Sequence, residues 1–228
     1  MGMSTVAVLL LAGNVTLSTV VAQQQGSVLQ WNVFPLALAY FIFTVAAFAE
    51  TNRVPFDLPE AEAELVAGYH AEYSAMKFSM FFIAEYANLV TASALMATFF
   101  FGGWDVPFTS WDNTAPWSIW KTLATLAAFG LKTGFFLFLY IWVRWTLPRF
   151  RYDQLMALGW KILLPLSLVY LMVLATAIWY LHDVLGWSYG ARFAGVLFLV
   201  NLAIAIPLFF VLDRGHLIAG SVPRRRVA

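Results

Sequence analysis

Long apolar segments separated by short polar stretches dominate this chain. A helix rises about 1.5 Å per residue, so about 20 apolar residues cross a bilayer. The pattern therefore predicts an all-α fold, a polytopic transmembrane helical bundle that forms a single integral membrane domain over residues 1–228. About six spans are expected, at residues 5–22, 33–49, 78–101, 119–147, 161–181 and 193–212.

The first apolar segment, "MGMSTVAVLLLAGNVTLSTVVAQQQ", also has features of a secretory signal, because Val20-Val21-Ala22 resembles a cleavage site. A signal normally begins with a positively charged region, and no Lys or Arg precedes this run. The missing basic start favours a membrane span over a cleaved leader.

Composition supports a membrane protein and excludes several kinds of site. Hydrophobic residues make up 62% of the chain and charged residues 11%, against roughly 25% charged in soluble domains. The chain has no Cys, which excludes disulfides, thiolate zinc sites and Cys-ligated iron–sulfur clusters. His70, His182 and His216 lie outside the centres of the apolar runs, so no haem between spans, and no metal site, is expected. A net charge of +1 gives no reason to expect a nucleic-acid partner.

Positive charge predicts the orientation. With six spans, ten of the 13 Lys and Arg residues share one side, whereas Lys121 and Arg192 lie on the other and Lys132 lies within a span. Positive residues favour the cytoplasmic side, so the loop at residues 50–77 and the C-terminus are expected to face the cytoplasm. The ten are Arg53, Lys77, Arg144, Arg149, Arg151, Lys161, Arg214, Arg224, Arg225 and Arg226.

The loop at residues 50–77 holds half of the 12 acidic residues of the chain. Its Asp-Leu-Pro-Glu sequence is typical of a helix start, and two glutamates four residues apart then share one helix face. Proton uptake is one relief for such like charges. A solvated loop with a capped helix is the simpler alternative, but the interleaved apolar residues favour packing that partly buries the acids. The six are Glu50, Asp57, Glu60, Glu62, Glu64 and Glu72.

Two charges fall within predicted spans. Glu85 lies in "FFIAEYANLV" and Lys132 in "AAFGLKTGFF". A charge at the bilayer centre costs on the order of 3 kcal/mol, so such residues usually pair with one another or belong to an ion or proton path. The alternatives are a structural carboxyl hydrogen-bonded to a neighbour and a lysine whose ammonium reaches an interface.

A second basic loop, "WVRWTLPRFRYDQLM", contains Arg149, Arg151 and Asp153. Positive charge on the cytoplasmic side alone explains the arginines. The aromatic residues between the charges add a second interpretation, in which this loop docks onto a soluble partner.

Three stretches carry a family resemblance: "AETNRVPFDLPEAEAELVAGYHAEYS", "FFIAEYANLVTASALMATFFFGGW" and "WVRWTLPRFRYDQLMALGWK". Together they resemble the H subunit of proton-pumping NADH:quinone oxidoreductase, respiratory complex I. The resemblance implies a membrane subunit that helps form the quinone chamber and couples quinone reduction to proton translocation. It implies no redox centre in this chain, because NADH, FMN and iron–sulfur clusters are bound by partner subunits.

The resemblance also implies roles for particular residues, none of them at a catalytic centre. Glu50, Glu72 and Glu85 match proton-path acids of the family, and the sequence adds Lys132 to that path. Arg53, Asp57, Glu60, Glu62 and Glu64 match the quinone-chamber and coupling loop. The implied partners are hydrophilic quinone-module subunits and small membrane subunits, in the cell inner (plasma) membrane. The family's chains extend further at the N-terminus, so this sequence is interpreted as the C-terminal two-thirds.

Three alternatives remain open from the sequence. The equivalent membrane subunit of an energy-converting hydrogenase or formate hydrogenlyase shares the resemblance, although "ETNRVPFD" and the alternating glutamates fit the quinone branch better. A free-standing ion transporter predicts internal repeats and broken spans at the midplane, and no repeat is seen. A passive membrane anchor predicts that neutralising the acids affects assembly alone.

Overall fold

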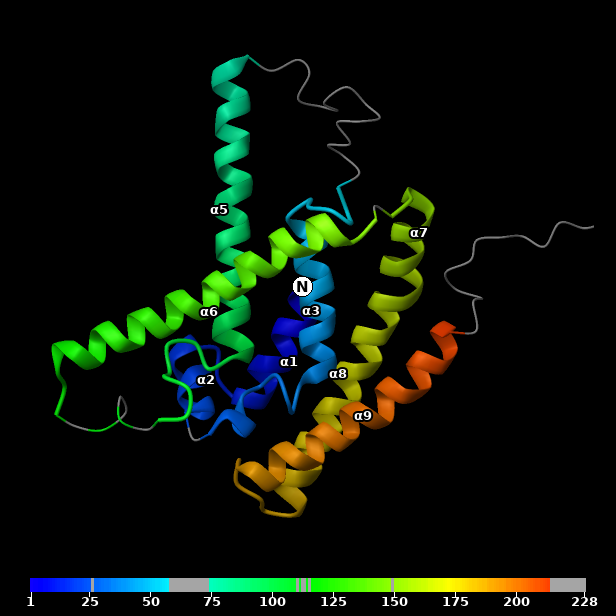
Figure 1. The fold of residues 1–228 in the computed structure, drawn as a ribbon. Helices are drawn as coiled ribbons and strands as arrows, with labels where there is room; N and C mark the ends of the chain where they lie inside the picture. Colours follow the sequence, from blue (N-terminus) through cyan, green and yellow to red (C-terminus); the bar gives the residue numbers. More distant parts are fainter. Residues whose placement is uncertain are drawn as a thin grey trace, which may run out of the picture.

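The computed structural model describes residues 1–25, 27–57, 74–109, 111, 114, 116–148 and 150–213. Regular structure within these ranges is entirely helical, which confirms the all-α prediction (Figure 1). The helices are α1 (Gly2–Ala12), α2 (Leu17–Gln24), η1 (Val28–Gln30), α3 (Ala37–Glu50), α5 (Ala75–Phe100), α6 (Ile119–Thr146), α7 (Tyr152–Ala157), η3 (Leu158–Leu163), α8 (Leu164–Trp179), η4 (Tyr180–Val184) and α9 (Ala191–Asp213).

Four helices of the described residues are long and apolar enough to cross a membrane. Two are α5 and α6, the third is the continuous run Tyr152–Val184 that joins α7 to η4, and the fourth lies in α9. These agree with the last four predicted segments. The prediction of six spans is wrong, because the structure supports four, or up to five if the bent pair α1 and α2 is one span.

The first predicted span is broken at Gly13. Helix α1 ends at Ala12, and Gly13 has a φ of 66°, the left-handed conformation that ends many helices. Helix α2 begins only at Leu17, and the two helices are bent by 65°. The apolar run is therefore continuous in sequence but not in direction.

The second predicted span is too short. Helix α3 has 14 residues, and at about 1.5 Å per residue it covers roughly 21 Å of a hydrocarbon core of about 30 Å. Its start is held by a buried amide on α9: Asn201 Nδ2 donates to the Pro35 carbonyl oxygen at 2.6 Å, and the Leu38 N–H donates to Asn201 Oδ1 at 3.2 Å. Hydrogen bonds to α9 thus hold the start of this short helix in place.

Aromatic side chains join α3 to α5 and α6 in the core. Phe43 and Phe100 are almost fully buried, with ring centroids 5.5 Å apart in an edge-to-face arrangement. The Phe101 and Phe136 rings meet in the same way at 5.0 Å. Such pairs prefer this geometry because the electron-rich face of one ring attracts the edge of the other. Helix α6 crosses α5 (Figure 1).

Two fully buried amides satisfy the C-terminal end of α5. Gln24 Nε2 donates to the carbonyl oxygens of Thr98 and Phe99, both at 3.3 Å, and Asn32 Nδ2 donates to Phe99 at 2.9 Å. The Gly102 N–H donates to Gln24 Oε1 at 3.0 Å. The last carbonyl oxygens of a helix have no hydrogen-bond partner within it. These bonds supply partners and so avoid the free-energy cost of burying unpaired carbonyls.

The loop after α3 and the residues after α6 meet at the start of the Tyr152–Val184 run. The Phe150 N–H donates to the Pro55 carbonyl oxygen at 3.1 Å, and the Phe56 and Phe150 rings stack at 5.5 Å. Two of the regions predicted to share a membrane side therefore touch. The basic C-terminal tail lies beyond the described residues.

Replacing Gln24 by Leu is expected to lower the free energy of unfolding by about 1–3 kcal/mol, because the α5 carbonyls and the Gly102 N–H stay buried without their partner. Thermal unfolding of the purified chain in detergent would measure this. Gln25→Leu is the matched control, since Gln25 follows α2 and is only half-buried. Equal unfolding midpoints for the two variants would contradict the capping role.

Candidate functional site

The candidate site lies where the loop after α3 meets α5. Arg53 Nε lies 2.6 Å from Glu85 Oε1, and the two side chains are 13% and 18% exposed. The sequence singled out both residues, for different reasons, and the structure brings them together. Glu85 therefore has a cationic partner close to the end of α3.

The loop after α3 aims Arg53 at α5. The Thr51 hydroxyl donates back to the Ala47 carbonyl oxygen at 3.0 Å, which completes the last turn of α3. Asn52 then adopts a φ of 50°, a left-handed conformation that Asn tolerates better than most residues. The Phe56 N–H donates to the Arg53 carbonyl oxygen at 2.8 Å and closes a turn. These local backbone and side-chain interactions thus set the path of the loop that carries Arg53.

A tyrosine next to Glu85 provides a second contact for the guanidinium. The Arg53 Cζ atom lies 4.7 Å from the centre of the Tyr86 ring, within the range of a cation–π interaction. Arg53 Nη2 is buried and has no hydrogen-bond partner among the described residues. A guanidinium carries five N–H donors, so Arg53 retains hydrogen-bonding capacity beyond its ion pair.

A pocket of about 340 Å³ opens beside this ion pair, between α5 and α6. A second arginine, Arg144, contributes to its wall, and one turn earlier the Tyr140 ring packs against Phe48 with centroids 4.2 Å apart. Apolar walls with two cations suit a ligand that has an apolar body and oxygen acceptors. The lining residues are Arg53, Tyr86, Leu89, Val90, Leu137, Tyr140, Ile141, Arg144 and Trp145.

Lys132 does not join this site. Its Nζ donates to the carbonyl oxygens of Gly103 at 3.0 Å and Asp105 at 2.7 Å, and it lies 4.9 Å from the centre of the Trp31 ring. Gly103 follows the C-terminal end of α5, and Glu85 is 15 residues before that end, or roughly 22 Å along the helix. The partner that the structure gives Glu85 is thus Arg53 and not Lys132.

The structure describes some of the other predicted site residues but not all of them. Glu50 is exposed at the end of α3, and Asp57 is half-buried in the following loop. Arg151 Nε and Asp153 Oδ2 form an exposed pair at 3.3 Å, at the start of α7. The remaining predicted site residues lie outside the described part of the chain: Glu60, Glu62, Glu64, Glu72 and Arg149.

Among the pocket's charged and hydroxyl-bearing side chains, three were not predicted as site residues from the sequence: Tyr86, Tyr140 and Arg144. Tyr86 follows Glu85 directly, and the other two are four residues apart, a spacing that places them on one helix face. That spacing was visible in the sequence. Which face of α6 meets α5 depends on packing, so the spacing alone did not identify the pocket.

The described residues contain no group of three or more His, Asp or Glu side chains that could hold a metal ion. The site is instead defined by one ion pair, one cation–π contact and a two-arginine pocket. These side chains offer cationic hydrogen-bond donors beside an apolar surface.

Comparison with known proteins identifies one family. Residues 1–175 match the family described as NADH dehydrogenase. The chain is 54% identical over 177 residues to the second H-type NADH-quinone oxidoreductase subunit of Koribacter versatilis, covering 77% of this chain and 49% of that protein. It is 51% identical to NADH-quinone oxidoreductase subunit 8 of Rhodothermus marinus, covering 78% and 54%. For the H-type NADH-quinone oxidoreductase subunit of Flavobacterium psychrophilum the identity is 49%, covering 76% and 50%. The chain thus spans about half the length of these curated relatives.

The Arg53–Glu85 pair is expected to show strong energetic coupling. Arg53→Met alone leaves a half-buried carboxylate without its cation, so it should destabilise the chain more than the double variant with Glu85→Met. A double-mutant cycle of unfolding free energies measures the coupling, with about 1–3 kcal/mol expected for this shielded pair. The control is Arg151–Asp153, whose side chains are 82% and 75% exposed, for which about 0–1 kcal/mol is expected. Additive single effects at Arg53 and Glu85 would contradict the pairing.

Proposed function

Because this chain belongs to the NADH dehydrogenase family, we propose that it acts as the H-type membrane subunit of a proton-translocating NADH:quinone oxidoreductase. In this role it forms part of the wall of the quinone chamber and helps couple quinone reduction to proton movement. The observation that carries the proposal is the Arg53–Glu85 ion pair beside a pocket that combines two arginines with apolar walls.

A quinone fits the chemistry of this pocket. Its tail is apolar, and its head group carries two carbonyl oxygens that accept hydrogen bonds. Leu89, Leu137 and Ile141 offer apolar contact, whereas Arg53 and Arg144 offer donors. Reduction to the quinol consumes two electrons, delivered by a partner subunit, and two protons. The N–H groups of these two guanidinium side chains attract and orient the oxygens through hydrogen bonds.

Coupling follows from competition for Arg53. Negative charge that develops on the quinone oxygens attracts the guanidinium and weakens its hold on Glu85. A carboxylate that loses a cation binds a proton more readily, so Glu85 takes up a proton when the quinone is reduced. Return of the guanidinium to Glu85 then favours release of that proton. The pair thus converts a change of charge in the pocket into movement of a proton.

The other acids singled out in the sequence belong to the same proposal. We assign a longer proton path to Glu50, Glu72 and Lys132, and a role in the coupling loop to Asp57 and its neighbouring glutamates Glu60, Glu62 and Glu64. The loop and the C-terminus face the cytoplasm of a cell inner membrane in this scheme. Arg149, Arg151 and Asp153 lie on the same side and dock a hydrophilic partner.

These relatives all carry the name of a quinone oxidoreductase subunit, which favours the quinone branch over the membrane subunit of a hydrogenase. A quinone also explains why the pocket is apolar, since proton reduction in a hydrogenase needs no such ligand. No observation on the described residues favours a free-standing transporter.

Glu85→Gln in the assembled complex is expected to lower the number of protons pumped per NADH oxidised, because an amide cannot take up and release a proton. Asp57→Asn should act in the same direction through the coupling loop. Proton uptake by inverted membrane vesicles, normalised to the amount of assembled complex, measures this. Asp183→Asn, an exposed acid near the end of the Tyr152–Val184 run, is the control. Full pumping by an assembled Glu85→Gln complex would remove this residue from the path.

Arg53→Ala is expected to raise the KM for a short-tailed quinone by roughly tenfold, which corresponds to about 1.4 kcal/mol of lost interaction. Steady-state NADH:quinone kinetics would measure this. Arg192→Ala, which removes an exposed arginine at the start of α9, should leave the KM unchanged. An unchanged KM in Arg53→Ala would exclude contact with the quinone.

A further inference from the structure

A second pocket of about 340 Å³ lies among α3, the loop that follows it, the end of α6 and the start of the Tyr152–Val184 run. Its wall includes Val45 and Phe48 from α3, Leu147 after α6, and Ile162 and Leu166 beyond α7. It is separate from the two-arginine pocket, which lies between α5 and α6. Its volume is in the range of small-molecule sites.

This second pocket offers no free polar group. Thr44 is the only lining residue with a polar side chain, and its hydroxyl donates to the Tyr40 carbonyl oxygen at 2.8 Å. A cavity without polar partners does not hold ordered water. A quinone head group, a sugar or a nucleotide would lose its hydrogen bonds there, so the occupant is a hydrocarbon segment.

The depth of the pocket in the membrane follows from its surroundings. The stacked rings of Phe56 and Phe150 contribute to its wall, at the point where the chain passes from α6 into α7. Trp145, Tyr152 and Trp160 in this region are 84%, 60% and 66% exposed. Exposed tryptophan and tyrosine near span ends mark the membrane–water boundary. The pocket therefore lies just inside that boundary, where the chains of lipids begin.

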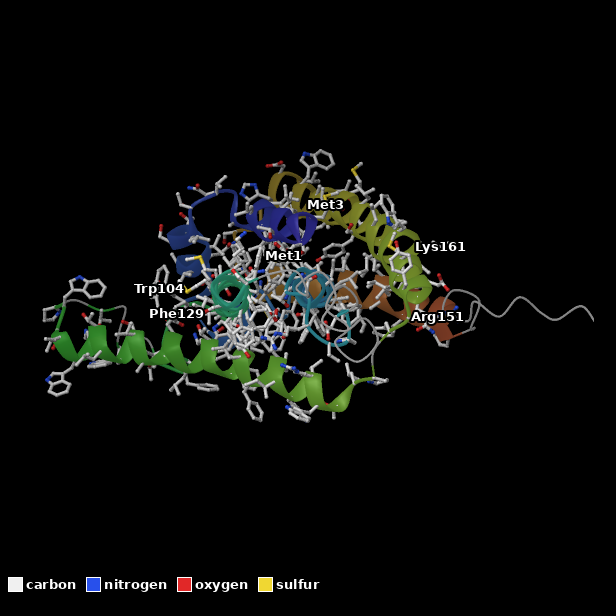
Figure 2. The ribbon with its side chains drawn as sticks, turned by 90° about the horizontal axis from the view of Figure 1, so that it is seen from above. Met1, Met3, Trp104, Phe129, Arg151 and Lys161 are labelled. Carbon is white, nitrogen blue, oxygen red and sulfur yellow. The ribbon has the colours of Figure 1, made fainter. Side chains whose placement is uncertain are left out.

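The charges near the second pocket indicate the head group of a lipid whose hydrocarbon chain fills it. Next to the lining residues Phe150 and Ile162, the sequence carries the basic residues Arg151 and Lys161. Figure 2 shows Arg151 and Lys161 at the end of the bundle where the Tyr152–Val184 run begins. Lys161 is exposed and has no ion-pair partner among the residues that the structure describes. Basic residues beside a pocket between membrane helices attract anionic lipid head groups.

We propose that the second pocket binds one acyl chain of an anionic phospholipid whose head group lies near Lys161. The hydrocarbon fills the space between α3, α6 and the Tyr152–Val184 run, and the phosphate remains at the membrane surface. Such a lipid ties together helix ends that otherwise meet through few polar contacts. This proposal does not depend on the quinone function, because it concerns a different pocket.

The first test is the phospholipid content of the chain, purified from native membranes in a mild detergent with the subunits that accompany it. Val45→Phe fills the pocket and is expected to remove one bound phospholipid per chain, measured by native mass spectrometry and phosphorus analysis. Val169→Phe adds the same volume on α8 at a residue that is 58% exposed, and should change nothing. Equal phospholipid content in Val45→Phe and the unmodified chain would overturn the proposal, as would loss of a bound quinone instead.

The second test concerns the head group and does not require the pocket to tolerate a new side chain. The unmodified chain is reconstituted in nanodiscs with equal amounts of phosphatidylglycerol and phosphatidylcholine, then extracted and washed. We expect phosphatidylglycerol to be retained preferentially, and Lys161→Gln to reduce that preference by about fivefold. Equal retention of the two lipids by the unmodified chain would overturn the choice of an anionic lipid.

Discussion

The site depends on one constraint: a carboxylate within a membrane span needs a cationic partner. Glu85 on α5 meets that requirement with Arg53, at 2.6 Å and largely shielded from solvent. The contact fixes the loop after α3 against α5 and leaves the guanidinium beside a pocket. In the proposed function, a new negative charge in that pocket competes with Glu85 for Arg53, because the pair is only partly shielded from solvent. Structure and proposed coupling therefore rest on the same two side chains.

Convergence of helix ends produces two pockets of opposite chemistry. One lies between α5 and α6 and contains Arg53 and Arg144, so it suits a ligand with oxygen acceptors. The other lies between α3, α6 and the Tyr152–Val184 run and presents only apolar surface. The loop that follows the short helix α3 contributes to both pockets, with Arg53 in the first and Pro55 and Phe56 in the second. Asn201 and the aromatic core stabilise that short helix.

Hydropathy predicted the fold class and the four longest spans, because each has enough consecutive apolar residues to cross a bilayer. It failed at Gly13, since average hydropathy does not register a left-handed residue that redirects the chain. Glu85 was identified from the sequence as a membrane acid, but its partner was not. Arg53 is 32 residues away in sequence, and only tertiary packing brings the two together. Tyr140 and Arg144 were missed for the same reason.

The most direct test of the central claim is redox-induced infrared difference spectroscopy of the assembled complex. Reduction of the quinone should change the carboxyl absorption as Glu85 exchanges Arg53 for a proton. We expect this signal in the unmodified complex and in Asp183→Asn, and its loss in Glu85→Gln. A carboxyl signal that persists undiminished in Glu85→Gln would contradict the claim that this ion pair responds to the quinone.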